Sequence, residues 1–202
     1  MKKFIFAAVG LAALAAGLTA CNEEEKLAKD VAGAWSTDQQ TLFNNAQGQA
    51  TGGDVFTFEV DPKTKNGGIV NVATNISLSR ASDALTPANQ PFSVSVAALA
   101  SVSGRWEAID DDEIRIDFDA NTLKVTVDPE AVALVANPLS GTSQAEVDSL
   151  RPQMAQFYQT ELMNTMSARY SSFSKLDDVK LRNSGKTLKF EASDIDYILQ
   201  RR

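Results

Sequence analysis

The chain has 202 residues, with 19 basic and 26 acidic side chains, a formal net charge of -7, one cysteine and no histidine. An acidic chain without runs of lysine or arginine is unsuited to binding nucleic acid or to electrostatic docking on anionic lipid. The absence of histidine excludes Ser-His-Asp and Cys-His catalysis, imidazole-based zinc hydrolases and a histidine pH switch.

The N-terminus has the layout of a secretory signal. Lys2 and Lys3 precede an unbroken small and apolar stretch from Phe4 to Leu18, which leads through two small residues to Cys21. This stretch is short and rich in alanine and glycine, so it does not predict a permanent membrane span. We expect residues 1–20 to be removed, which takes two lysines from the 19 basic residues and leaves 17 against 26 acidic ones, a net charge of -9.

Leu18-Thr19-Ala20-Cys21 resembles the lipobox of bacterial lipoprotein precursors. The resemblance implies that the Cys21 thiol receives a diacylglyceryl group, that a peptidase cleaves before it, and that fatty acyl chains such as palmitate then hold the protein on a membrane. Several chains on one residue give stable anchoring without a transmembrane helix. Cys21 is the only cysteine, so no internal disulfide competes for it. The alternatives are a cleaved signal with an incidental cysteine, or an uncleaved anchor.

The residues after the cysteine bear on the membrane address. Asn22 stands where many lipoproteins of double-membrane bacteria carry the Asp that marks inner-membrane retention, which favours the outer membrane. Glu23-Glu24-Glu25-Lys26 resembles the acidic stretch that helps some lipoproteins face outward, but it also fits a solvated acidic tether over residues 21–30. Periplasmic and surface-facing orientations both stay open.

Residues 31–202 are predicted to form one domain, because no glycine-, serine- or proline-rich linker divides them. Alternating apolar and polar residues predict short strands separated by turns. The predicted strands cover residues 33–39, 54–60, 69–79, 92–96, 114–118, 123–127, 179–182, 188–191 and 197–200, with a loop at 48–53 and a turn at 61–68. The two strands at 114–118 and 123–127, joined by a turn at 119–122, form the clearest predicted hairpin.

A helical segment is predicted over about residues 129–173. Pro129 suits a first helical turn, and Ser143-Gln144-Ala145-Glu146 has the pattern of a capping box. Apolar residues then recur at three- to five-residue spacing, with an interruption or restart near Pro152. The predicted fold class is therefore mainly β: an antiparallel meander of eight or nine strands forming a barrel or sandwich, with a helical insertion before the last strands.

Gly33-x-Trp35 and Gly104-x-Trp106 resemble the opening motif of lipocalin-like domains. The resemblance implies a β-barrel with a tryptophan at its closed end and an arginine from a late strand, here Arg201, packed across the indole. The chain departs from that pattern in its extra segment after Pro129 and in lacking a lipocalin-type cysteine pair.

Trp35 and Trp106 are the candidate ligand-binding residues, although a tryptophan beside glycine in a β protein is more often a buried core residue. Asp117, Asp119 and Asn121 have the alternate spacing of a calcium loop, but that spacing also describes the outer face of a strand. We expect neither a metal nor a cofactor.

The run from Asp110 to Glu113 could supply paired carboxylates for acid-base catalysis, yet adjacent acids in a turn favour exposure because like charges repel. The leading hypothesis is a membrane-anchored, non-enzymatic domain that binds a small apolar or amphipathic ligand in a cavity of a few hundred Å3. The alternative is a structural or protein-interaction module of a cell-envelope complex, and an enzyme ranks third.

Overall fold

The computed structural model describes residues 23–45, 48–81, 92–138 and 140–202. It has the expected mainly β fold: a closed, antiparallel, eight-stranded barrel of lipocalin-like form, two further strands, and helices before the last three strands. The strands are β1 (Gly33–Thr37), β2 (Gln40–Asn45), β3 (Gly48–Val60), β4 (Gly67–Arg80), β5 (Phe92–Ala108), β6 (Ile114–Phe118), β7 (Lys124–Ala136), β8 (Lys175–Arg182), β9 (Thr187–Ala192) and β10 (Ile195–Arg201). The helical elements after β6 are the 3-10 turn η1 (Ala120–Thr122), α2 (Gln144–Asp148) and α3 (Arg151–Ser172).

The barrel closes where β1 pairs with strands from both ends of the chain. The ring runs β1-β10-β9-β8-β6-β5-β4-β3, and β3 returns to β1. Trp35 lies at this closure, opposite Arg201 of β10 on one side and Phe56 of β3 on the other. Each strand of the ring thus pairs on both sides, although the pairing of β6 with β8 has only two residue pairs, Ile114–Leu176 and Arg115–Lys175.

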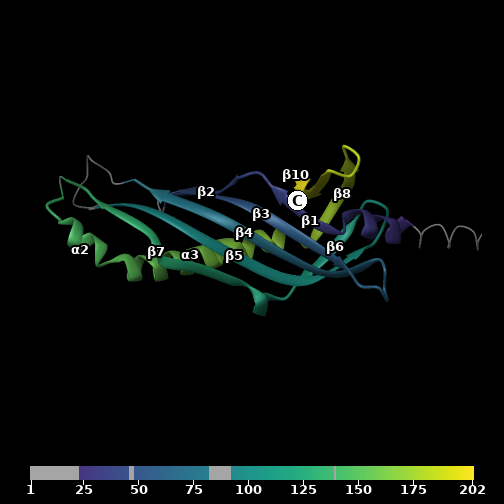
Figure 1. Ribbon diagram of the computed structural model, residues 1–202, viewed down its shortest axis with the longest axis horizontal. Helices are drawn as coiled ribbons and strands as arrows, with labels where there is room; N and C mark the ends of the chain where they lie inside the picture. Colours follow the sequence, from purple (N-terminus) through teal and green to yellow (C-terminus); the bar gives the residue numbers. More distant parts are fainter. Residues whose placement is uncertain (1–22, 46–47, 82–91, 139) are drawn as a thin grey trace, which may run out of the picture.

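Three long strands extend beyond the barrel. β3, β4 and β5 have 13, 14 and 17 residues, and beyond the closed ring they are flanked by β2 and β7 instead of β1 and β6. The result is a curved five-stranded sheet that continues the barrel on its left in Figure 1, with α3 running behind the long strands. α3 buries one side against this sheet, through residues at helical spacing: Ala155, Tyr158, Leu162, Met166 and Tyr170.

The predicted hairpin of residues 114–118 and 123–127 is wrong, although both segments are strands. β6 and β7 do not pair with each other; both pair with β5, β6 along Gly104–Ala108 and β7 along residues 92–101. Residues 120–122 form η1, through which the chain continues in the same direction along β5. The segment Asp119-Ala120-Asn121-Thr122 lacks the glycine that a tight reversal favours.

The prediction that the helical segment begins near residue 129 is also wrong, because residues 129–136 continue β7 and helix begins at Gln144. Pro129 is tolerated because the β5–β7 register shifts between Val96 and Ala98, so a bulge replaces the regular ladder opposite this proline. Val132 and Leu134 are buried whereas Val135 is 60% exposed, which is the two-residue period of a strand.

Several local predictions are confirmed. Ser143 and Glu146 form the capping box at the start of α2, and Pro152 lies in the first turn of α3, where its missing N–H costs no hydrogen bond. The last three strands are present with longer bounds than predicted.

The prediction of a loop at residues 48–53 is wrong. These residues are the start of β3, which pairs there with β2, a strand that was not predicted.

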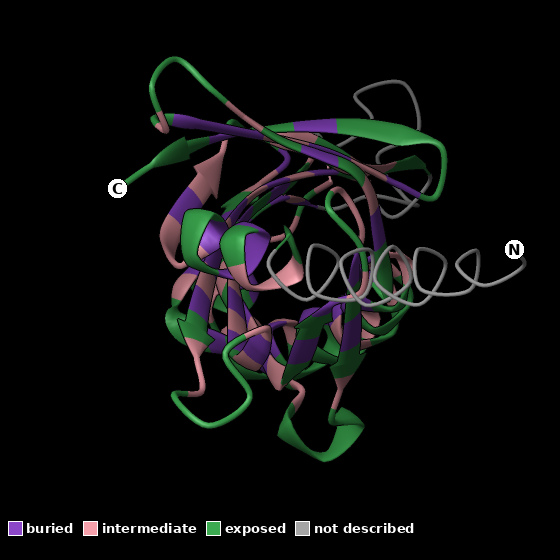
Figure 2. Cartoon of the chain, turned by 90° about the vertical axis from the view of Figure 1, so that its right-hand side faces the viewer, coloured by how far each residue is buried: buried purple, intermediate pink, exposed green. Residues whose placement is uncertain are grey.

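A helix over residues 23–31 covers the end of the barrel. Its Leu27, Ala28 and Val31 are at most 6% exposed, and Figure 2 shows this helix lying across the ring of strands. Much of the predicted acidic tether is therefore packed on the barrel.

Arg201 fastens this helix to the barrel. Its guanidinium carbon lies 4.3 Å from the Trp35 ring centroid, the cation-π contact that the lipocalin resemblance implies. The same group donates hydrogen bonds to the Asp30 and Ala32 carbonyl oxygens, at 2.9 and 3.3 Å, and to Gly185 O at 2.9 Å. One side chain therefore joins the N-terminal helix, β1 and the β8–β9 turn.

We expect Arg201→Met to destabilise the protein by about 2 kcal/mol, because it removes a cation-π contact and charge-assisted hydrogen bonds while keeping an unbranched apolar side chain in place of the aliphatic part of arginine. Urea unfolding of wild type and variant measures the change. Arg201→Lys is the matched control. It keeps the charge but lacks the planar guanidinium with its several N–H donors, so it should recover only part of the lost stability. Full recovery by lysine would contradict the geometric role assigned to the guanidinium.

Candidate functional site

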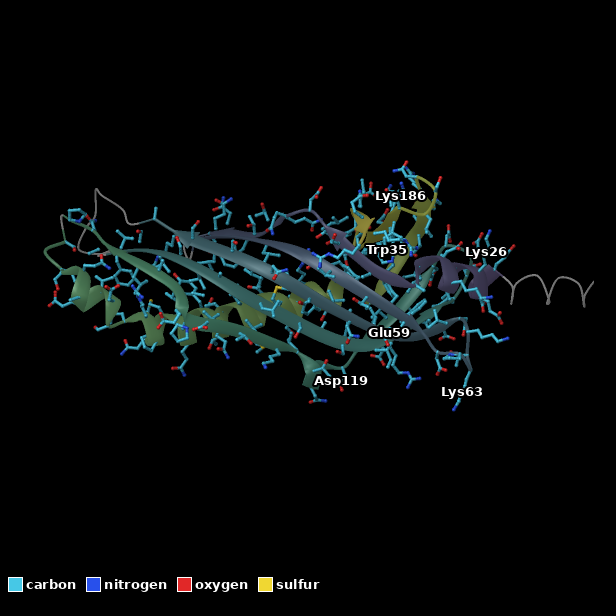
Figure 3. The ribbon with its side chains drawn as sticks, viewed as in Figure 1. Lys26, Trp35, Glu59, Lys63, Asp119 and Lys186 are labelled. Carbon is cyan, nitrogen blue, oxygen red and sulfur yellow. The ribbon has the colours of Figure 1, made fainter. Side chains whose placement is uncertain are left out.

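Trp35, one of the two predicted ligand-binding residues, lies in the core. It is 0% exposed, and its indole Nε1 donates to the Val31 carbonyl oxygen at 2.7 Å. Arg201 covers one face of the ring. Figure 3 places Trp35 beneath the C-terminal strands, and its polar atom is already paired within the protein. Trp35 therefore plugs the closed end.

Trp106 has the same kind of environment. It is 3% exposed, its Nε1 donates to Glu59 O at 3.1 Å, and its ring packs edge-on against Phe58 at 5.2 Å. An open hollow of about 220 Å3 lies beside it, and its lining also includes Asn66, Arg105 and Glu107. Gly104 lies two residues before this tryptophan. A Cβ at this position would lie only 2.4 Å from the Asp117 carbonyl oxygen of β6, so the close approach of the two strands requires glycine.

Aromatic side chains occupy the closed half of the barrel. They meet at ring-centroid distances from 5.1 to 6.5 Å, mostly edge-to-face, in a cluster of Phe56, Phe58, Phe173, Phe190 and Tyr197. All five are at most 2% exposed. This half is a packed core, so a ligand site must be sought where α3 covers the five-stranded sheet.

A buried ion pair lies between α3 and β3. The Asp54 side chain is 0% exposed and accepts from both Nη2 and Nε of Arg169, whose side chain is 12% exposed. Thr74 donates to Asp54 Oδ1 at 2.7 Å, and the Tyr170 hydroxyl lies 2.8 Å from Thr74 Oγ1. The single Thr74 proton goes to Asp54, so Tyr170 is the donor in the second bond. Gln40 Oε1 accepts from Arg169 Nη2 at 2.9 Å.

The protonation of this network is fixed by its surroundings. Burial pushes the pKa of Arg169 down, but the hydrogen bonds and charge of Asp54 outweigh it, so the pKa stays above its ordinary value. Burial raises the pKa of the Tyr170 hydroxyl, partly offset by its hydrogen bond to Thr74. Both groups therefore stay protonated, and the network joins β2, β3, β4 and α3 with its polar groups satisfied.

The network was not predicted, although one signal was present. Asp54 has the same parity along β3 as the buried Phe56 and Phe58, so a carboxylate on that face needs a partner inside the barrel. The partner, Arg169, is 115 residues away in sequence, and no local pattern identifies it.

A side pocket of about 350 Å3 opens where β6 ends and the wall passes to β7. Its lining residues come from β5, β6, η1, the residue before β7, the last turns of α3 and the segment after α3: Val102, Ile116, Asp117, Phe118, Ala120, Leu123, Ser167, Tyr170, Ser171 and Ser174. Its lining combines apolar side chains, such as Ile116 and Leu123, with three serines, and the Ser171 hydroxyl donates to the carbonyl oxygen of Ser167. Its inner end reaches Tyr170, whose ring lies 6.1 Å from Phe118.

The acidic candidates do not converge. Asp119 accepts hydrogen bonds from the backbone and side-chain nitrogens of Asn121 and so caps η1. Glu113 pairs with Lys175 at 3.0 Å, and Asp110 accepts from the backbone of Asp111. Within residues 23–45, 48–81, 92–138 and 140–202, no group of three or more acidic, cysteine or histidine residues could hold a metal ion.

Cys21 and the predicted signal segment 1–20 lie outside the described residues. In the part of the chain that the structure describes, no helix combines the length and the apolar character needed to cross a membrane. No known family model matches the chain, and no curated protein does.

Proposed function

We propose that the protein is a lipid-anchored domain of the bacterial outer membrane, attached through acylated Cys21, that binds a small apolar or amphipathic ligand without catalysing a reaction. The lipobox residues support the anchor. The lipocalin-like barrel is consistent with a binding role, but a fold alone does not carry a function.

The side pocket is the observation that carries the ligand proposal. Its volume of about 350 Å3 lies in the range of small-molecule sites, and its lining combines apolar side chains with serine and tyrosine residues that could bind a polar end. A larger hollow of about 500 Å3 lies on the outer face of the sheet. It is lined mainly by small residues, which provide little apolar contact area for a ligand. We therefore propose the side pocket as the ligand site in place of Trp35 and Trp106, whose rings are buried.

The packed closed half of the barrel favours a second candidate, a structural or protein-interaction module of an envelope complex. Phe157 on α3 is 42% exposed, although its neighbour Tyr158 is completely buried, so this helix presents an apolar ring to solvent. A partner protein could cover it.

The anchor would also orient the domain. Two residue steps separate Cys21 from residue 23, where the described helix begins, and they span at most about 7 Å. Because this helix packs on the closed end of the barrel, that end would face the lipid. Lys26, Lys63 and Lys186 lie at this end in Figure 3, whereas α2 lies at the opposite end and would point into the aqueous space.

Site-specific photo-crosslinking in cells tests the two candidates. Leu123 in the side pocket is replaced by p-benzoylphenylalanine, and the irradiated protein is analysed by mass spectrometry. We expect an adduct of a few hundred daltons on Leu123, because the benzophenone would contact a ligand in the pocket. Val135, which is 60% exposed on the outer face, is the matched position and should give no such adduct. A protein-sized adduct at residue 123, with no small one, would reject the ligand proposal in favour of the interaction module.

A further inference from the structure

Tyr158 of α3 carries a buried hydroxyl without a partner. The residue is 0% exposed, and its hydroxyl oxygen forms no hydrogen bond within the described ranges 23–45, 48–81, 92–138 and 140–202. Burial raises the pKa of this hydroxyl, so it is a neutral donor. A buried hydroxyl loses its bonds to water, and leaving it unpaired costs free energy of folding.

Arg80, the last residue of β4, has a second unpaired group. Its Nε is buried and has no hydrogen-bond partner among the same described residues. Thr74, Ile76 and Leu78 of β4 are buried on the inner face, and Arg80 has the same parity along the strand. The arginine therefore lies on the face that α3 covers, at the end of the sheet away from the closed barrel.

The topology places these two groups at a similar distance along the sheet from the hydrogen bond between Tyr170 and Thr74. α3 and β4 run in opposite directions and are joined by the hydrogen bond between Tyr170 and Thr74. From Tyr170 back to Tyr158 is about 18 Å along the helix, and from Thr74 to Arg80 is about 20 Å along the strand. The positive charge of Arg80 also acts on the pKa of Tyr158, lowering it against the effect of burial, which fits this proximity.

Apolar residues surround the pair on the inner face of the sheet. Arg80 is opposite Val94 of β5, which is opposite Leu134 of β7, and both are at most 3% exposed. Two donors that lack an acceptor, set among buried aliphatic side chains, match a molecule with an anionic oxygen and an apolar body.

We propose that Arg80 and Tyr158 together bind the anionic head group of an amphipathic ligand, a carboxylate or a phosphate ester, at the end of the five-stranded sheet away from the closed barrel. The Arg80 Nε–H and the Tyr158 O–H donate to the same head group. The pair lies about 18 Å along α3 from Tyr170 of the side pocket, so it is a second site that goes beyond the proposed function.

The test uses the mature lipoprotein in phosphatidylcholine nanodiscs, titrated by calorimetry with octanoate, octanol and inorganic phosphate. We expect octanoate to bind at least tenfold more tightly than octanol, because charge-assisted hydrogen bonds form only with the anion. The chain has three tyrosines, so 13Cζ labelling gives three NMR signals. Octanoate should shift the signal of Tyr158 and leave those of Tyr170 and Tyr197 in place.

Two variants isolate the head-group contacts. Tyr158→Phe and Arg80→Gln should each weaken octanoate binding about tenfold and leave octanol binding unchanged. Tyr158→Phe should melt at the wild-type temperature or above it, because it removes only an unpaired hydroxyl, so lost affinity cannot be assigned to misfolding.

Each remaining outcome overturns a distinct claim. Equal affinities for octanoate and octanol, or an unmoved Tyr158 signal, would overturn the anionic head group and leave the proposed function standing. Phosphate binding as tightly as octanoate at Tyr158 would show a free anion site and overturn the amphipathic ligand. If neither octanoate nor octanol binds, the head-group proposal falls, whereas the side pocket is tested separately by the crosslink at residue 123.

Discussion

Replacing Asp54 with alanine should destabilise the protein by about 3–5 kcal/mol, because it leaves the Arg169 guanidinium inside the fold without its counter-charge. The Asp54 side chain is 0% exposed and that of Arg169 is 12% exposed, so water cannot replace the lost carboxylate without opening α3. Thr74 also loses its acceptor. Equilibrium unfolding in urea, followed by circular dichroism, measures the change.

A double substitution separates the buried charge from the packing. Asp54→Ala combined with Arg169→Met removes both charges and keeps an apolar side chain in place of the aliphatic part of arginine, so it should recover much of the stability lost in the single variant. Lys175→Ala breaks an exposed ion pair with Glu113 and should leave the unfolding midpoint nearly unchanged. An Asp54→Ala variant as stable as the Lys175→Ala variant would refute the role of the buried pair.

Local patterns predicted the strands better than their partners. Alternation along Ile114–Phe118 correctly indicated a strand, because one face is buried whatever it pairs with. Its pairing was predicted wrongly because nearness in sequence favours a hairpin, whereas the 17-residue β5 offers one edge long enough for both β6 and β7. The length of β5 could not be predicted, since Ala97-Ala98-Leu99-Ala100 interrupts the alternation of polar and apolar residues.

The candidate site was predicted less well, for a physical reason. Trp35 and Trp106 were identified from their motifs, and both are buried, as large aromatic side chains in the core of a β protein usually are. The side pocket has both Leu123 and Ser171 in its lining, and the proposed head-group site combines Arg80 with Tyr158. Such combinations depend on where α3 crosses the sheet, and no local sequence pattern reports that position.

Replacing Cys21 with serine should move the protein from the membrane fraction to the soluble periplasmic fraction. Each buried methylene of an acyl chain contributes about 0.8 kcal/mol, and a hydroxyl in place of the thiol provides no site for the lipid. Metabolic labelling with palmitate and fractionation of the cells measure both consequences: label and membrane association should disappear together. The buried face of the 23–31 helix, which includes Leu27 and Val31, is unchanged, so the unfolding midpoint should match wild type.

The matched control keeps the thiol and changes the next residue. Asn22→Asp should retain the palmitate label while shifting the protein toward the inner membrane, because the lipobox resemblance assigns attachment to Cys21 and sorting to its neighbour. A Cys21→Ser protein that stays on membranes after a high-salt wash would contradict the anchor, since an acidic chain has little electrostatic attraction to anionic lipid. Membrane binding would then be due to the folded domain, and the proposal that the closed end of the barrel faces the lipid would be wrong.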